Sequence, residues 1–227
     1  MIAKLINLEA CNARAIGMLS VLTVFIIAVG FCGHLYAMPT HNMKSSGLND
    51  SLLIDRDGNK YSIKKMLDNN LWMTANLKLN IPDSYCYGNI KENCEQYGRL
   101  YTWESAQKGC SVLGEGWRLP TDDEWQKLAT AYGLPLDSVD YRVGAYKALM
   151  KDGNAAFNAL LGGGRDTDGK YARLDAHGFY WTATEINDSA AVFYNFGKGS
   201  HRLYRQDGGE KSEAFAVRCV KKPGIVQ

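Results

Sequence analysis

Apolar residues recur at helical spacing in two parts of the chain, residues 102–109 and 122–132. In the second part, apolar residues occupy positions i, i+3, i+4 and i+7, which is the spacing of one helix face. These residues are Trp125, Leu128, Ala129 and Tyr132. Gly133 follows them directly and suits a helix end. In the first part and directly after it, Trp103, Ala106 and Cys110 fall at i, i+3 and i+7. The sequence therefore predicts two principal helices, with Cys110 on a buried face.

Shorter apolar runs predict strands. The stretch "SLLIDRDGNKYSI" (51–63) has two β-prone runs around an Asp-Gly turn, which indicates a hairpin. The stretch "LWMTANL" (71–77) alternates apolar with polar residues, as a half-buried strand does. Near the C-terminus, "GFYWTAT", "AAVFYNF" and "EAFAVRCVK" are strand-like, and in the last of these Cys219 and Arg218 face opposite sides. We expect an α+β fold, with two main helices packed on small, mostly antiparallel sheets.

The stretch "GWRLPTDDEW" (116–125) combines two tryptophans with three acidic residues and has the appearance of a site. Thr121 and Glu124, however, have the spacing of a capping box, in which each side chain bonds the backbone of the other residue. Asp122 and Asp123 fall in the first helical turn, where the helix dipole favours negative charge. We interpret the stretch as scaffold and not as an active site.

The first 37 residues have the pattern of a secretory signal peptide. Lys4 and Arg14 precede an uncharged run at 15–33, and the exit suits cleavage after Ala37. Two alternatives stay open: an uncleaved membrane anchor, and a lipoprotein acylated at Cys32. All three place the chain beyond the segment outside the cytoplasm, so we expect a secreted, periplasmic or cell-surface protein.

Polarity and charge divide the remainder of the chain. Residues 38–50 are polar without a hydrophobic period and are expected to be a linker. Residues 51–222 form the expected domain, and 223–227 a tail. With 26 basic and 24 acidic residues in the whole chain, there is no concentrated basic face for nucleic acid or anionic lipid. We therefore expect no nucleic-acid partner, and membrane contact only through the N-terminal segment.

Four cysteines lie in the expected domain, and in an oxidising compartment they suggest two disulfides. They are Cys86, Cys94, Cys110 and Cys219. Three pairings are possible. Cys86 and Cys94 flank a turn-like stretch and can close a short loop, which leaves Cys110 to pair with Cys219; both are expected to face inward. Because no C-x-x-C pair occurs, we expect no metal site at the cysteines.

Seven motifs occur in the order seen in the Fibrobacter succinogenes major paralogous domain family, which the chain resembles over nearly all of residues 52–221. They are "DRDGNKYSI", "LWMTANLK", "GRLYTWESA", "GWRLPTDDEW", "LLGGGRDTDGKY", "GFYWTATE" and "FAVRCVK". The motif "RLPTDDEW" is also similar to a helix start in formylglycine-generating (sulfatase-modifying) enzymes.

The resemblance implies a C-type-lectin-like, disulfide-stapled fold, in which a cysteine on a helix is bridged to one in the last strand. Cys110 and Cys219 occupy those places. It also implies an exported bacterial protein, often a lipoprotein or surface protein, whose family has no assigned biochemical role for most members. Some relatives with this fold are variable proteins of diversity-generating retroelements, which display binding residues before the final strand.

Familiar catalytic and cofactor motifs are incomplete. A formylglycine-generating enzyme needs a closely spaced cysteine pair late in the chain, where Cys219 stands alone. "GRDTDGKY" lacks the Ser or Thr of a P-loop, because Tyr171 follows Lys170. "DRDGN" has its glycine too early for a calcium loop. His177 and His201 lie in turn-like surroundings. We expect no enzyme activity, no cofactor and no metal.

The best functional candidate is the stretch 182–211, which mixes aromatic, basic and small polar residues. Tyr and Arg are enriched where proteins bind their partners. The candidate ligand-binding residues are Thr182, Glu185, Asn187, Tyr194, His201, Arg202, Tyr204 and Arg205. The prediction is an exported, surface-associated binding module for a protein or glycan. The alternatives are a solvated loop set without a ligand, a lipoprotein of structural role, and an enzyme with an unrecognised site.

Overall fold

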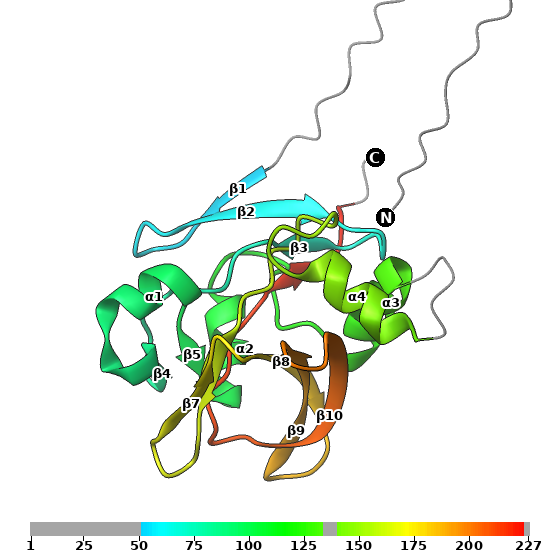
Figure 1. Ribbon diagram of the computed structural model, residues 1–227. Coiled ribbons are helices and arrows are strands. Elements are labelled where there is room, and N and C mark those ends of the chain that lie inside the picture. The colour runs from blue at the N-terminus through cyan, green and yellow to red at the C-terminus, as the bar shows by residue number, and fades with distance from the viewer. Residues whose placement is uncertain (1–50, 134–139, 225–227) are drawn as a thin grey trace, which may run out of the picture. The chain divides into compact units, whose positions relative to one another are not determined.

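The computed structural model describes residues 51–133 and 140–224, and these form an α+β fold (Figure 1). The predicted signal segment with Cys32, the linker and the last three residues of the tail lie outside the described residues. The helices are α1 (Lys91–Tyr97), α2 (Trp103–Ser111), α3 (Asp122–Gly133), α4 (Tyr141–Leu149) and the 3-10 turn η1 (Tyr87–Asn89). None of the described helices is long and apolar enough to cross a membrane.

Two sheets and a short ribbon make up the β structure of the described residues, and their pairing is mostly antiparallel as predicted. The first sheet has the order β1-β2-β3-β11: β1 (Ser51–Ile54), β2 (Lys60–Lys65), β3 (Leu71–Met73), β11 (Val220–Lys221). The second has the order β10-β9-β8-β6-β7: β10 (Arg202–Glu210), β9 (Ala190–Gly197), β8 (His177–Glu185), β6 (Gly162–Arg165), β7 (Tyr171–Leu174). β4 (Ser84–Tyr85) and β5 (Leu100–Tyr101) form the ribbon.

Both predicted main helices are present, at α2 and α3. The described residues also contain two α-helices that the sequence did not predict, α1 and α4. α4 contains the short apolar period around Tyr146 and packs beside α3, as Figure 1 shows. α1 begins at Lys91, at the end of the stretch between Cys86 and Cys94 for which the sequence suggested only a turn, and continues to Tyr97.

Both predicted disulfides are confirmed. One joins Cys86 to Cys94 and encloses η1 and the start of α1. The other joins Cys110 of α2 to Cys219, which directly precedes β11, across a sequence separation of 109 residues. The second bridge therefore connects a helix to the last strand of the first sheet.

The prediction of a half-buried strand at 71–77 is wrong in its extent and in its alternation. Only Leu71–Met73 is a strand, and the neighbours Trp72 and Met73 are both fully buried. β3 lies inside the first sheet between β2 and β11, and both of its faces are covered. Trp72 packs in the hydrophobic cluster that contains Trp125, whereas Met73 packs in the cluster that contains Cys110.

Candidate functional site

The stretch "GWRLPTDDEW" forms the start of α3 with the predicted capping box. The Thr121 backbone N–H donates to Glu124 Oε2 at 2.9 Å, and the Glu124 N–H donates to Thr121 Oγ1 at 3.3 Å. Arg118 holds the same carboxylate through two hydrogen bonds, of 2.7 and 2.6 Å. Burial of Glu124 opposes its ionisation, but the bonds from Arg118 and Thr121 outweigh this and lower its pKa. These contacts fix a helix start, as expected of scaffold.

Trp125 is the centre of an aromatic cluster and has no exposed surface. Its ring stacks on Tyr194 with centroids 5.1 Å apart and an interplanar angle of 17°. Trp72, Phe157 and Tyr180 pack around it with centroids 5.2 to 5.7 Å away. The tryptophan that made the stretch resemble a site is therefore a core residue.

The eight predicted ligand-binding residues lie in β8, β9 and β10 and in the turns that join them, but two of the eight are buried. Thr182 is fully buried, and its hydroxyl donates to the Val192 carbonyl oxygen at 2.9 Å. Tyr194 is 3% exposed, and its hydroxyl donates to Asp122 Oδ1 at 2.9 Å. Including these two in a binding surface is a misassignment, because neither side chain has surface to offer a ligand.

Four others lie at opposite ends of the sheet. Glu185 and Asn187 are at the β8–β9 turn, where Asn187 Oδ1 accepts the Ser189 and Ala190 backbone N–H groups at 2.9 Å. His201 and Arg202 lie at the β9–β10 turn, at the other end of β9. Eight strand residues separate the ends by roughly 25 Å. The predicted residues therefore do not form one site.

Both predicted arginines are held by acidic residues at helix starts. Arg205 Nε lies 2.8 Å from Asp122 Oδ2 at the start of α3. Arg202 Nε lies 3.1 Å from Asp140 Oδ2, and Asp140 is the N-cap of α4. The Asp140 pKa is lowered well below its ordinary value, first by its hydrogen bond with Arg142. These pairs tie β10 to the two helices.

Tyr204 belongs to a set of side chains on the side of β8, β9 and β10 that faces away from Trp125. The strand register places Phe179 opposite Asn195 and Asn195 opposite Tyr204. We call this set the aromatic face: His177, Phe179, Phe193, Asn195, Tyr204 and Gln206, all half-buried.

Contacts within the aromatic face fix several of its members. His177 stacks on Phe179 with centroids 5.6 Å apart, and its Nδ1 lies 2.9 Å from Asn195 Oδ1. Phe179 packs edge-on against Phe193, with centroids 5.9 Å apart. No acidic side chain and no lysine is among the six residues. The result is an apolar platform, edged by two amides, on rigid strands.

Sequence reasoning missed five of the six residues of this face. A signal was present, because aromatic residues in β8 and β9 occupy both odd and even positions. Phe179 and Phe193 face one side, whereas Tyr180 and Tyr194 face the other. The second set is only partly covered: the rings of Phe179 and Phe193 pack on buried Phe215, with centroids 5.1 and 4.8 Å away, and the rest of each side chain stays half-exposed.

The remaining candidate motifs have structural roles. In the "DRDGN" hairpin, Asp55 accepts the backbone N–H of Asp57 and of Asn59, and the Tyr61 hydroxyl at 2.6 Å. "GRDTDGKY" forms the turn between β6 and β7, where Lys170 pairs with Asp168. Within the described residues, no cluster of three or more His, Cys, Asp or Glu side chains could hold a metal ion.

A hollow of about 480 Å³ is lined by none of the residues of the aromatic face. It is lined by residues near β3, by α1 and by the loop after α4, among them Thr74, Lys78, Glu95, Lys151 and Asn158. The Lys78 ammonium already donates to the Glu95 carbonyl oxygen at 2.7 Å. The hollow contains none of the eight predicted residues.

Comparison with known proteins agrees with the sequence motifs. Neither the curated proteins nor the solved structures gave a match. The family model described as the Fibrobacter succinogenes major domain matches residues 40–221, which is most of the chain. The chain therefore belongs to the Fibrobacter succinogenes major domain family.

Proposed function

We propose that the protein is an exported, surface-associated binding module without catalytic activity, and that its aromatic face receives a protein or glycan ligand. The observation that carries the proposal is the placement of three aromatic rings and two amides on one half-buried strand surface. By contrast, Arg202 and Arg205 of the same sheet are paired with acidic residues at helix starts.

The chemistry of the face suits recognition through apolar contact and hydrogen bonds. Aromatic rings bury a large area, and those with only two side-chain torsions lose little conformational entropy on binding. Asn195 and Gln206 offer both a donor and an acceptor, and Asn195 is already oriented by His177. Because the side chains stand on strands, the face is preorganised, which favours affinity.

Export is supported by two separate features. The N-terminal 37 residues have the pattern of a signal peptide, and two disulfides are typical of proteins that fold in oxidising compartments.

The mass of the protein recovered from expressing bacteria tests the proposal of export. A chain that begins at Met38 supports cleavage, acyl mass on Cys32 identifies a lipoprotein, and an intact Met1 with membrane association identifies an anchor. A full-length chain recovered from the cytosol would contradict export.

Ligand binding is tested with a glycan array and with pull-downs from bacterial and host surface fractions. Tyr204→Ala should weaken capture by roughly tenfold, as expected at a binding hot spot. The matched control is Ile54→Ala, which removes an apolar side chain that is 55% exposed on β1 of the other sheet. Equal loss in both variants, or no ligand for the wild type in either screen, would overturn the proposal.

A further inference from the structure

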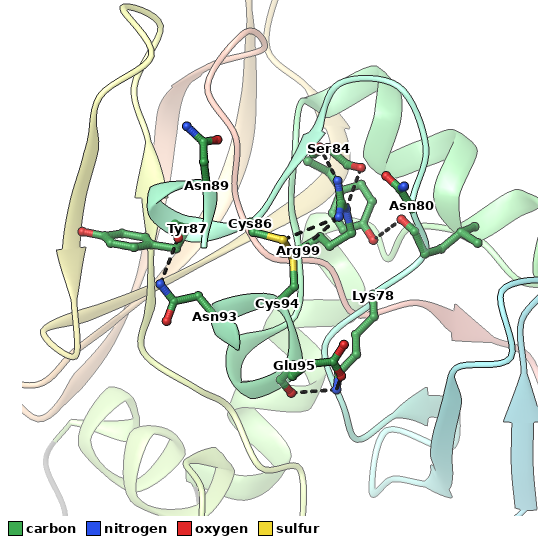
Figure 2. The surroundings of a disulfide bond; sticks show 12 residues. Lys78, Asn80, Ser84, Cys86, Tyr87, Asn89, Asn93, Cys94, Glu95 and Arg99 are labelled. Atoms are coloured by element: carbon green, nitrogen blue, oxygen red, sulfur yellow. Dashed lines mark hydrogen bonds and ion pairs between the residues drawn. A yellow bond between two sulfur atoms is a disulfide. The ribbon is translucent and has the colours of Figure 1, made fainter. Parts of the chain in front are cut away.

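The Cys86–Cys94 disulfide has a positively charged neighbour that the Cys110–Cys219 disulfide lacks among its described contacts. Figure 2 shows the guanidinium of Arg99 beside the sulfur–sulfur bond. Its Nη1 lies 3.6 Å from the Sγ of Cys86 and 3.6 Å from the Sγ of Cys94. The charge is therefore directed at both sulfur atoms.

The pairing of β4 with β5 holds Arg99 in this position. Arg99 directly precedes β5, and Ser84 lies in β4, where it accepts hydrogen bonds from the other two guanidinium nitrogens. Arg99 Nε donates to Ser84 Oγ at 2.9 Å, and Nη2 donates to the Ser84 carbonyl oxygen at 2.6 Å. Among the described residues, no carboxylate forms an ion pair with Arg99. Ser84 thus holds two of the guanidinium nitrogens, and the third, Nη1, is directed at the sulfur atoms.

The two disulfides also differ in access. Cys86 is half-buried at the start of η1, and its partner Cys94 is 6% exposed on α1. Cys110 and Cys219 are both fully buried among apolar residues. An external thiol can approach Cys86 more readily than any of the other three cysteines.

We propose that Cys86–Cys94 is a thiol–disulfide exchange site for a small thiol or dithiol, with Cys86 as the attacked sulfur and Cys94 as the leaving thiolate beside Arg99. The incoming thiolate forms a bond to Cys86 Sγ while the bond between the cysteines breaks. The electron pair of the broken bond leaves on Cys94 Sγ, and a mixed disulfide remains on Cys86. Attack by a second thiolate on the external sulfur releases Cys86 and leaves the two external thiols oxidised to a disulfide.

Arg99 assists this step because exchange is faster when the leaving thiolate is more stable. A neighbouring arginine stabilises a thiolate relative to its thiol, whereas apolar burial has the opposite effect. Arg99 contacts Cys94 directly, while Cys110 and Cys219 lie in a hydrophobic cluster. Both access and charge therefore predict selective exchange at Cys86–Cys94.

The first test measures reduction of the full-length oxidised protein by reduced glutathione, with alkylated cysteines quantified by mass spectrometry. Cys86 and Cys94 should be labelled before Cys110 and Cys219. Arg99→Gln should slow their labelling at least about threefold, and Arg99→Lys should restore much of the rate. The control Asn93→Ala removes the Asn93–Tyr87 hydrogen bond of the same loop without a change of charge. An unchanged rate in Arg99→Gln, or slowing in Asn93→Ala as great as in Arg99→Gln, would overturn the role of Arg99.

A second test does not depend on the folding of the Arg99 variants. In Cys86→Ser, the rate of iodoacetamide labelling of Cys94 as a function of pH reports the pKa of its thiol. We expect a value below about 8.5, the ordinary value of a free cysteine. A value at or above 8.5 in the folded variant, verified by thermal melting, would show that Arg99 does not outweigh the burial of Cys94, and the proposal would fail.

Discussion

At the scale of single residues, Arg218 carries a charge that is fully buried and has no carboxylate partner among the described residues. Its guanidinium donates to Asn76 Oδ1 at 2.6 Å and to the backbone carbonyl oxygens of Met73, Phe157 and Asn158. It also lies 4.7 Å from the ring centroid of Phe157. Burial lowers its pKa. Arg218 thus joins the C-terminal segment to the end of β3, to Asn76 and to the loop at 157–158. No other described side chain donates to these four acceptors.

Replacement of Arg218 should therefore destabilise the fold strongly. Arg218→Met keeps much of the side-chain volume but leaves buried acceptors unpaired, and we expect a loss of roughly 3 kcal/mol or more in the free energy of unfolding. Urea denaturation measures it. The control Arg56→Met changes a side chain that is 63% exposed and should stay within about 0.5 kcal/mol of wild type. Equal stability of the two variants would show that the buried hydrogen bonds of Arg218 contribute little.

Glu124 predicts a defined dependence of stability on pH. Its pKa is lowered in the folded protein, so its carboxylate contributes stability above its unfolded pKa of about 4.3, and this is lost as pH falls through the lower folded value. Glu124→Gln should therefore be less stable than wild type at pH 7, and the difference should shrink as the pH falls below about 4. Denaturation at pH 7, 5 and 3 measures this. Glu92→Gln, an exposed change on α1, should show a much smaller effect, and a constant difference for Glu124→Gln would contradict the linkage.

At the scale of elements, the predictable parts carried their own local signals. α3 has a capping box, an apolar face and a terminal glycine within one stretch, and its bounds agree closely with the prediction. α1 has only seven residues and no side-chain cap, so its stability depends on contacts from elsewhere. One is the Cys86–Cys94 bridge, and another is the Tyr97 hydroxyl, which donates to Asp175 at 2.7 Å. Short elements held by distant residues leave no periodic pattern to detect.

The candidate site shows the same limit. The sequence showed that the second sheet is rich in Tyr and Arg. It did not show which residues of the same chain pair with those side chains. Arg205 pairs with Asp122 and Arg202 with Asp140, across 83 and 62 residues of chain. Such pairs depend on how α3 and α4 pack against β10, which no local spacing encodes. Tyr204 was found from residue type, whereas Phe179 required knowledge of the strand register, which places it in line with Asn195 and Tyr204.

The two disulfides should differ in their contribution to stability. In the chain-entropy model, a bridge stabilises more when it closes a longer loop. Cys110–Cys219 spans 109 residues and Cys86–Cys94 spans eight, which the model converts to about 5 and about 2.5 kcal/mol. Double alanine variants of each pair, compared by urea denaturation, measure both values. A larger loss from Cys86–Cys94 would show that native contacts around Arg99, and not loop closure, dominate.

At the scale of the whole domain, the stretch "GWRLPTDDEW" connects the two sheets. The Arg118 backbone N–H donates to the Val220 carbonyl oxygen of β11 at 3.1 Å, which attaches the stretch to the first sheet. The Ala183 N–H of β8 donates to the Pro120 carbonyl oxygen at 2.7 Å, which attaches it to the second. The Asp122 N–H donates to a β8 threonine hydroxyl at 2.9 Å. The backbone of the stretch therefore joins the two sheets, while Glu124 serves the helix start and Trp125 the core.

Because the stretch "GWRLPTDDEW" is structural, we expect variants in it to lose stability, whereas a variant of the aromatic face should lose ligand capture. Trp125→Ala should cost roughly 3–5 kcal/mol, because it empties the centre of the aromatic cluster. Asp123→Asn, an exposed change in the first turn of α3, should cost well under 1 kcal/mol. Tyr204→Ala should leave the melting temperature nearly unchanged while it weakens ligand capture.

Thermal melts and capture assays on these three variants form the decisive comparison. For Trp125→Ala, any loss of capture should match the unfolded fraction and disappear at a temperature at which the variant is folded, because the ring lies on the opposite side of the sheet from the aromatic face. For Asp123→Asn, capture should equal that of wild type. If instead Asp123→Asn kept the wild-type melting temperature and abolished capture, the acidic helix start would be the site, and the aromatic face would be only a surface.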